Sequence, residues 1–593
     1  MCVRIYTDWM QLGCARTAME HHESELLGAL QRYWGYDSFR PMQERIVRSL
    51  LGGQDACVVM PTGGGKSLCY QLPAALLAER TVVVVSPLIA LMQDQVAQLT
   101  QMGISAALLN STLDASEQSA ILREAIAGRY RLLYLSPERL ARADTIEWLQ
   151  RVPVSLFAID EAHCISEWGH EFRPEYRQLS SLRRHFPERP IAAFTASATR
   201  QVRHDIIEQL ALREPHKYIA SFHRANLRYV VKECNAQMQS YLLVRALRNY
   251  SGSNVIVYAP TIARVEETVE FLAAEGIRAI GYHGKMDNGA RRRNQEKWMS
   301  DEVPVLVGTV AFGLGINKAA VRAVIHLSLP KSIEQYYQEA GRAGRDGLPA
   351  DCVMLWQKKD VGLLTHFMQQ LTDPQERERG WQRYHIIRNF VESAACRHRQ
   401  ICLHFGESPK WATCGACDVC GCEIEWLNAP VPALKSKRRG KRSATGRAVA
   451  TAAAASITFT RGPRTSSGQE NELAASASAA AASTAGSGWW GSAAKRENLG
   501  ASAKIAAGID PELREYMREW RRVASRKMNI AAFIIMHDTS LDHLCQVQPR
   551  SLAEIRKVSG FGERKTEMYG PAILEALERF RNGARMVEEP FDD

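Results

Sequence analysis

Short apolar runs alternate with longer, helix-like segments through residue 356 of the chain. β-Branched runs that indicate buried strands lie at 55–60, 80–86, 130–136, 155–160 and 190–197. A second series of such runs lies at 253–259, 277–283, 303–309, 322–328 and 351–356. Because strands that alternate with helices form parallel sheets with helices on their faces, the pattern predicts two α/β domains, over 23–223 and 224–356.

The rest of the chain changes character several times. Residues 357–428 are rich in Cys and His and predict a small helical module. Residues 429–507 consist largely of Ala, Ser and Gly with few large apolar side chains, which predicts a disordered linker. Helical periodicity returns over 508–582, where we expect a small all-α domain before an acidic tail, 583–593. Residues 1–22 are expected to be peripheral.

Composition narrows the class of protein. No run approaches the ~18–20 apolar residues of a membrane span, and no secretion signal is apparent. The 14 cysteines are therefore expected to stay reduced, in a cytoplasmic protein that is nucleoid-associated if bacterial. The net charge of +11 predicts a polyanionic partner, but residues 431–507 alone carry 12 basic and 3 acidic side chains. We expect this linker to act as an electrostatic clamp, with an inert spacer as the alternative.

A glycine-rich stretch, "MPTGGGKS" at 60–67, joins the first predicted strand to a helix-like segment. Backbone N–H groups of successive glycines converge on phosphate oxygens, and the next helix presents its N-terminus to the same anion. Met60 stands where the strict pattern has glycine, so an ordinary glycine turn is the alternative. The candidate nucleotide-binding residues are Thr62, Gly63, Gly64, Gly65, Lys66, which reaches the β/γ-phosphates, and Ser67, a ligand for Mg²⁺.

Two carboxylates directly follow a predicted strand in "SLFAIDEAHCISEW", residues 155–168. An acidic residue at a strand end is where a parallel sheet holds Mg²⁺ beside a phosphate loop, so Asp160 joins Ser67 as a candidate magnesium ligand. Glu161 is then placed to orient and activate an attacking water. A charged turn after a strand is the alternative.

A basic stretch closes the second α/β domain, "SIEQYYQEAGRAGRDG" at 332–347. Arg342 and Arg345, with Gln338 one turn before them, are candidates to reach a γ-phosphate held by the first domain and to stabilise charge in the transition state. The alternative is a solvated basic helix.

Further motifs narrow the prediction. These are "FRPMQ" (39–43), "VVSPLIALMQDQV" (84–96), "DEAHCISEWGHEFRPEY" (160–176), "FTASAT" (194–199), "GTVAFGLGINK" (308–318) and "QEAGRAGRDG" (338–347). Together they resemble the RecQ family of superfamily 2 DNA helicases, most specifically in the aromatic-rich segment after Asp160. The resemblance implies two RecA-like domains that couple hydrolysis of Mg²⁺-bound ATP to 3′→5′ movement on single-stranded DNA and to unwinding in repair and recombination.

The resemblance also implies roles for individual residues. Arg40 and Gln43 would read the adenine of ATP. Trp168, Phe172 and Arg173 would sense single-stranded DNA and signal to His163 beside the nucleotide. Aromatic rings suit this role because they stack on any base, at roughly 1–3 kcal/mol per base.

Four cysteines have the spacing of a structural metal site. Cys396 precedes Cys414, Cys417 and Cys420, which form two overlapping CxxC pairs. Such a set makes a closed tetrahedral zinc site, and the RecQ zinc module has this arrangement. Cys422 is a weaker alternative to Cys396.

The C-terminal segment 508–582 resembles an HRDC domain, in particular at "GFGERK". Because residues 508–593 carry 14 basic and 15 acidic side chains, we expect weak DNA contact or contact with other repair proteins. The linker occupies the place of the winged-helix domain of longer RecQ proteins. We therefore expect the chain to lack the hairpin that usually separates the DNA strands, which bears on unwinding and not on ATP hydrolysis.

We expect a monomer that acts on single-stranded and forked DNA. The alternatives are a DNA-stimulated translocase that unwinds little and a non-catalytic DNA-binding scaffold.

Overall fold

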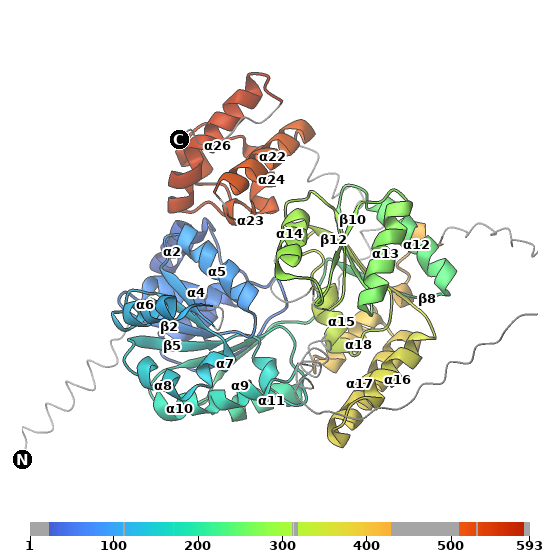
Figure 1. Ribbon diagram of the computed structural model, residues 1–593, viewed down its shortest axis with the longest axis horizontal. Coiled ribbons are helices and arrows are strands. Elements are labelled where there is room, and N and C mark those ends of the chain that lie inside the picture. Colours follow the sequence, from blue (N-terminus) through green and yellow to red (C-terminus); the bar gives the residue numbers. More distant parts are fainter. Residues whose placement is uncertain are drawn as a thin grey trace, which may run out of the picture.

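The computed structural model describes residues 23–110, 113–169, 171–310, 312, 318–428, 509–528, 530 and 532–585. The predictions for the N-terminal segment 1–22, for the linker 429–507 in the place of a winged-helix domain, and for most of the acidic tail concern residues that the structure does not describe. Figure 1 shows two α/β units side by side, with a helical domain lying over both. No helix among these described stretches has the length and apolar character needed to cross a membrane.

The first α/β domain is built on a seven-stranded sheet in the order β3-β4-β2-β5-β6-β1-β7. Every strand pair in it is parallel. Valine-rich runs such as Thr81–Val85 are buried along their whole length, as expected for strands covered on both faces. The strands are β1 Ala56–Val59, β2 Thr81–Val85, β3 Ala106–Leu109, β4 Leu132–Leu135, β5 Val154–Ile159, β6 Ile191–Thr195 and β7 His216–Ile219.

Helices connect these strands and cover the sheet. The α-helices are α2 Glu23–Trp34, α3 Gln43–Leu51, α4 Leu68–Leu76, α5 Ile89–Gln101, α6 Ala115–Ile126, α7 Pro137–Leu140, α8 Ala143–Leu149, α9 Pro174–Arg177, α10 Ser181–His185 and α11 Arg200–Gln209. Two 3₁₀ helices, η1 Ala162–Ile165 and η2 Gln178–Ser180, follow β5. Because all strands are parallel, the residues after β1, β2, β5 and β6 meet at one edge of the sheet, which is where such sheets bind ligands.

The second α/β domain has a six-stranded parallel sheet in the order β10-β11-β9-β12-β13-β8. Its strands are β8 Leu227–Glu233, β9 Asn254–Tyr258, β10 Ala279–Tyr282, β11 Val305–Gly308, β12 Val321–His326 and β13 Ala350–Trp356. Its helices are α12 Ala236–Asn249, α13 Ile262–Ala274, α14 Asn288–Met299 and α15 Ile333–Ala340. The prediction of two parallel α/β sheets is confirmed; the boundary between 223 and 224 stays a prediction.

The cysteine module, residues 357–428, packs against β8 at the edge of the second sheet. The Tyr229 N–H donates to the Ala416 carbonyl oxygen at 3.3 Å, and the Val231 N–H donates to Asp418 Oδ2 at 3.4 Å. Its helices are α16 Asp360–Gln369, α17 Pro374–Glu392, α18 Arg397–His404, the 3₁₀ helix η3 Asp418–Cys420 and α19 Glu425–Asn428.

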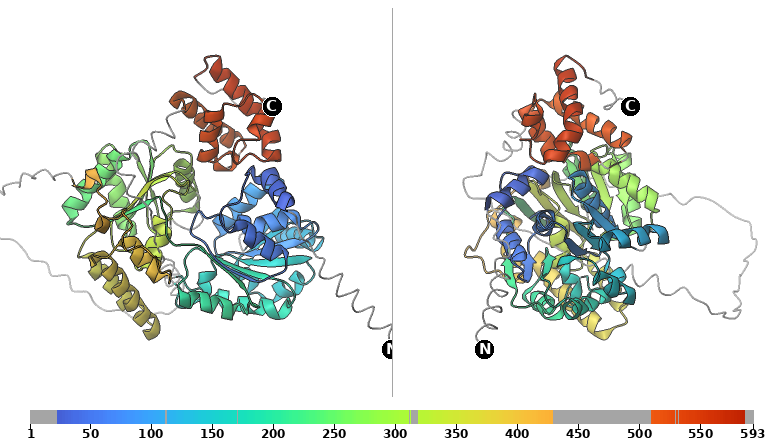
Figure 2. Two further views of the ribbon diagram at one scale, coloured as in Figure 1. Left: turned by 180° about the vertical axis from the view of Figure 1, so that it is seen from behind. Right: turned by 90° about the vertical axis from the view of Figure 1, so that its left-hand side faces the viewer.

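The C-terminal helical domain, residues 509–585, has its own core and also docks on both α/β domains (Figures 1 and 2). Its helices are α22 Pro511–Lys527, α23 Ala532–Ile535, α24 Asp538–Val547, α25 Leu552–Ile555 and α26 Glu563–Arg581. Helix α23 contacts α5 of the first domain and α14 of the second. Phe533 and Ile534 are buried there in one cluster with Trp298 and Phe312.

A buried ion cluster fixes this domain to the second α/β domain. Lys318 Nζ donates to Asp301 Oδ1 at 2.6 Å and lies 3.7 Å from Asp538 Oδ2. Arg521 Nη1 lies 2.9 Å from Asp538 Oδ1, and Arg521 Nη2 lies 3.7 Å from Asp301 Oδ2. On the first domain the Arg32–Glu563 ion pair, 3.0 Å from Nε to Oε2, makes a more exposed contact. The helical domain therefore bridges the two α/β domains.

Candidate functional site

The phosphate loop, residues 60–67, leaves β1 at the ligand-binding edge of the first sheet. Gly63 and Gly65 have φ of +84° and +83°, a backbone conformation that only glycine adopts without strain. Lys66 Nζ donates to the Met60 carbonyl oxygen at 3.2 Å, so the lysine folds back over the loop. Met60 itself is only 3% exposed. The departure from the strict glycine pattern therefore places a buried side chain at this position.

The segment "FRPMQ" packs directly on this loop. Gln43 Nε2 donates to the Gly65 carbonyl oxygen at 3.1 Å, and Gln43 Oε1 accepts from the Arg40 N–H at 2.8 Å. The Arg40 guanidinium donates to the Gly63 carbonyl oxygen. Two residues predicted to read a nucleotide base thus lie beside three glycines predicted to bind its phosphates.

Asp160 and Glu161 follow β5 at the same edge of the sheet. Asp160 is 5% exposed, and burial together with the Glu161 charge raises its pKa to about 7. Burial also lowers the pKa of Lys66, against the attraction of both carboxylates. Burial alone would raise the pKa of Glu161, but the hydrogen bond and charge of His163, with Lys66 and Arg342, lower it overall. The lysine, both acids and an arginine therefore act on one another electrostatically.

His163 links this acidic pair to the neighbouring strand. Its Nδ1 lies 3.3 Å from Glu161 Oε2 and 3.0 Å from the Thr195 hydroxyl at the end of β6. Two residues on, the Ser197 hydroxyl accepts from Gln338 Nε2 of the second α/β domain at 3.1 Å. A chain of short contacts thus runs from the acidic pair across the domain interface.

Arg345 reaches the phosphate loop from the second domain. A Cβ placed on Gly63 would lie only 3.2 Å from Arg345 Cγ. Burial, with the positive charges of Arg342 and Arg224, lowers the pKa of Arg345 to about 9. Arg342 is 7% exposed and close enough to Glu161 to lower the pKa of that acid. The two arginines therefore lie with Lys66 and the acids at the interface between the two α/β domains.

The aromatic loop, residues 164–176, leaves this site toward the surface. Trp168 is 51% exposed, which excludes a core role for its side chain. The Arg379 guanidinium from α17 lies 5.9 Å from the centre of the Trp168 ring, and Arg177 lies 5.1 Å from that of Phe172. Arg173 is held by Glu171 at 3.1 Å. An exposed aromatic ring beside arginines, as at Trp168, is typical of surfaces that stack nucleic-acid bases.

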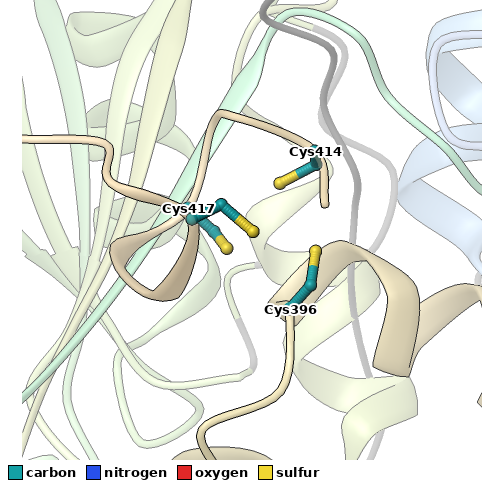
Figure 3. Close-up of side chains that lie close together, drawn as sticks. Cys396, Cys414 and Cys417 are labelled. Atoms are coloured by element: carbon teal, nitrogen blue, oxygen red, sulfur yellow. The ribbon is translucent and has the colours of Figure 1, made fainter. Parts of the chain in front are cut away.

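Four cysteines meet in the cysteine module. Figure 3 labels three of them, Cys396, Cys414 and Cys417, whose side chains point toward one another. The Sγ atoms of Cys396, Cys414, Cys417 and Cys420 all lie within 4.8 Å of one another. Cys422 is not in this group, which favours Cys396 as the fourth ligand. Arg397 Nη2 lies 2.9 Å from Asp418 Oδ2 and ties α18 to the turn with the last two cysteines. Four thiols in this arrangement fit a tetrahedral Zn²⁺ ion.

Comparison with known proteins identifies the family. The chain is 33% identical over 629 residues to the ATP-dependent DNA helicase RecQ of Pasteurella multocida (strain Pm70), covering 97% of this chain and 98% of that protein. It is 34% identical over 601 residues to the Haemophilus influenzae protein of the same name, covering 94% of this chain and 96% of the relative. This chain belongs to the RecQ family of ATP-dependent DNA helicases. The Bacillus subtilis (strain 168) RecQ helicase is 33% identical over 607 residues, 96% of this chain and all of the relative.

Four family models match along this RecQ helicase. They are DEAD/DEAH box helicase over residues 40–205, Helicase conserved C-terminal domain over 238–347, RecQ zinc-binding over 358–421 and HRDC domain over 510–577. The four-cysteine cluster is therefore a zinc site, and the C-terminal helical domain is an HRDC domain. ATP is the nucleotide, and the prediction of an ATP-dependent DNA helicase is confirmed.

Sequence reasoning missed several residues that the structure brings to the site. Gln95 of α5 donates from Nε2 to the Ser67 hydroxyl at 3.2 Å, and Thr195 contacts His163. Both lie in motifs that carry the family resemblance, "VVSPLIALMQDQV" and "FTASAT". Their position in those motifs is the signal that could have identified them. Arg379 gave no such signal, because it is one of many charged residues on a polar helix.

Proposed function

We propose that this RecQ helicase hydrolyses ATP between the phosphate loop of the first α/β domain and Arg342 and Arg345 of the second, and that hydrolysis drives 3′→5′ movement on single-stranded DNA. The observation that carries this proposal is the convergence at one interface of Lys66, the acidic pair Asp160–Glu161 and the two arginines. Basic groups from two separate domains can bind a polyanion, and the acidic pair beside them can act in its hydrolysis at the same place.

Each residue has a role that its chemistry supports. Backbone N–H groups of the phosphate loop would hold the β- and γ-phosphates, with Lys66 neutralising their charge. The Ser67 hydroxyl and the Asp160 carboxylate are oxygen ligands of the kind that Mg²⁺ prefers, and a bound Mg²⁺ would offset the charge of the phosphates. Glu161 would orient the attacking water and accept its proton, with His163 holding the Glu161 carboxylate in place.

The arginines would complete the site from the other domain. Arg345 beside Gly63, and Arg342 near Glu161, would stabilise the charge that spreads over the transferred phosphoryl group. The Gln338–Ser197 hydrogen bond would report the state of this interface to β6. Loss of the γ-phosphate would weaken these contacts and let the domains move apart, which is the stroke that a translocating motor needs.

The aromatic loop would couple this site to DNA. Trp168 and Phe172 would present rings for bases. Arg173 and Arg379 would supply positive charge for the backbone once released from their ion pairs with acidic residues of the same loop. The loop begins directly after His163, so a shift of Trp168 on binding DNA would reach Glu161 through only a few residues. This arrangement supports single-stranded and forked DNA as the substrates. The similarity to bacterial RecQ helicases supports a cytoplasmic location.

ATP hydrolysis with and without single-stranded DNA tests the assignment. We expect Lys66→Ala to abolish hydrolysis and to leave DNA binding near the wild-type level, because Lys66 lies on the phosphate loop and not on the aromatic loop. Lys358→Ala is a matched control, because that lysine is 80% exposed and pairs with surface Glu233. Wild-type turnover in Lys66→Ala would reject the assignment of the phosphate loop.

A further inference from the structure

The interdomain strap, residues 220–226, joins β7 of the first sheet to β8 of the second. It contains one arginine, Arg224, whose side chain is part-buried between the two α/β domains. Nothing in the proposed chemistry uses this residue. Its position at the direct chain connection between the two sheets makes it a candidate to control how the catalytic groups of the two domains meet.

Arg224 bonds to both sides of the ATP site at once. Its Nη1 donates to the carbonyl oxygens of Thr62, in the phosphate loop, at 3.4 Å and of Gly341 at 3.2 Å. Its Nη2 donates to the carbonyl oxygens of Ala343 at 3.1 Å and of Gly344 at 2.9 Å. A planar guanidinium holds its donors in a fixed fork. Three of the four bonds hold the backbone of the segment after α15, and the longest one connects that segment to the phosphate loop.

That segment is the arginine loop, residues 341–348, which carries Arg342 and Arg345. A second strap residue, Asn226, holds it from the same side: its Nδ2 donates to the Gly344 carbonyl oxygen at 2.7 Å and to the Leu348 carbonyl oxygen at 2.8 Å. Gly344 has φ +54°, and a Cβ on it would lie 2.4 Å from Asn226 Nδ2. The strap thus approaches the arginine loop closely enough to set its backbone.

The cysteine module also anchors the strap. Glu407 accepts from the Phe222 N–H at 2.8 Å and from the Ser221 hydroxyl at 2.6 Å. The Phe222 ring is stacked on Phe405, with ring centres 4.5 Å apart and planes 10° apart. The strap is therefore held between the zinc-bearing module and the ATP site.

Among the described residues Arg224 forms no ion pair, since all its hydrogen-bond acceptors are neutral carbonyl oxygens. Its positive charge therefore adds to the field that Arg342 and Arg345 create around the phosphate loop. Two properties of Arg224, the geometry of its fork and its charge, can be separated experimentally, because lysine keeps the charge but concentrates its donors at one point.

We propose that Arg224 is a positioning residue for ATP hydrolysis: it sets the arginine loop against the phosphate loop, and the cysteine module holds it in place through Glu407. The proposal rests on the proposed roles of Arg342 and Arg345. It connects the cysteine module to catalysis through a short physical path, from Glu407 to the strap and from the strap to the arginine loop.

Steady-state kinetics of Arg224→Lys test the proposal. We expect kcat for DNA-stimulated ATP hydrolysis to fall roughly 10- to 100-fold, with KM for ATP within about 3-fold of wild type, because the transition-state contacts are lost while the ground-state charge is kept. The melting temperature and the zinc content should stay at wild-type values. Arg248→Lys is the matched control, because that arginine is 61% exposed and pairs with Glu275 on the surface.

A double-mutant cycle tests the anchor. Glu407→Gln should lower kcat by a smaller factor, and Arg224→Lys with Glu407→Gln should be no worse than Arg224→Lys alone, because both act on one path. Effects that multiply, or a wild-type kcat in Arg224→Lys, would overturn the proposal. So would a fall in kcat that is matched by loss of zinc and of thermal stability, since this would indicate a role in folding only.

Arg345→Ala separates this proposal from the one on which it rests. If Arg345→Ala loses hydrolysis while Arg224→Lys keeps it, only the role of Arg224 is wrong. If Arg345→Ala keeps wild-type hydrolysis, the role of the arginine loop itself is wrong, and the positioning role of Arg224 is overturned with it.

Discussion

Replacing Asp538 with asparagine removes one negative charge from the buried ion cluster that joins the HRDC domain to the second α/β domain. Asp538 faces Lys318 at 3.7 Å and Arg521 at 2.9 Å, and both cations are almost fully buried. Breaking a buried ion pair by removing one partner costs ~3–5 kcal/mol. Since Asp301 still pairs with Lys318, and the amide still accepts from Arg521, we expect a loss of about 2–3 kcal/mol.

Differential scanning calorimetry of the full chain measures this loss. In a domain of this size, 2–3 kcal/mol corresponds to a fall in Tm of roughly 8–24 °C for the transition of the HRDC domain. Hydrogen exchange should become faster in α14 and α5, which α23 covers. Glu575→Gln in α26 of the same domain is the control, because Glu575 is 59% exposed and pairs with Arg579 on the surface. We expect a change of ~1 kcal/mol or less there.

The pH dependence follows from the same cluster. Burial alone would raise the pKa of Asp538, but the charges of Lys318, Arg521 and Arg514 hold it below its usual range. A lowered folded-state pKa stabilises the docked form above the unfolded pKa of about 4, and this contribution is lost as the pH falls further. Asp538→Asn should lack this acid-dependent component. A variant with wild-type Tm, wild-type exchange and an unchanged acid profile would refute the reasoning.

Two further predictions concern the aromatic loop and the zinc site. Trp168→Ala should keep basal ATP hydrolysis but lose most of its stimulation by single-stranded DNA, because the ring is half exposed and its removal leaves the core intact. A circular dichroism spectrum that shows an unfolded variant would contradict this. Cys417→Ser should lower the amount of bound zinc and destabilise the cysteine module, because Cys417 is fully buried in the four-thiol cluster. Elemental analysis measures the zinc, and wild-type protein without zinc under reducing conditions would reject the zinc site.

Local sequence was enough to predict the sheets and the groups at their ends. Valine-rich runs such as β2 that alternate with helical segments predict a parallel sheet covered on both faces, and the carboxyl ends of its strands then gather at one edge. Lys66 and Asp160 are therefore neighbours although 94 residues separate them in the chain. The cysteine site was equally predictable, because Cys414, Cys417 and Cys420 have the spacing of zinc ligands, and the fold was needed only to choose Cys396 over Cys422 as the fourth.

Long-range polar contacts could not be predicted in this way. Arg224 resembles an ordinary charged loop residue, and only the folded chain brings the Thr62 and Gly344 carbonyl oxygens to it. Lys318 and Asp538 lie 220 residues apart and have no periodicity that relates them. The near-zero net charge of the HRDC domain predicted a weak DNA surface, but net charge contains no information about which charges are buried in an interface with the same chain.

Unwinding of a tailed duplex tests the central claim most directly. A labelled duplex with a 3′ single-stranded tail and the same duplex with a 5′ tail are incubated with the full chain, ATP and Mg²⁺, with Lys66→Ala as the inactive control. We predict strand separation of the 3′-tailed substrate alone, and none with Lys66→Ala or without ATP. Preference for the 5′ tail, or DNA-stimulated ATP hydrolysis with no strand separation on either substrate, would contradict a 3′→5′ unwinding motor.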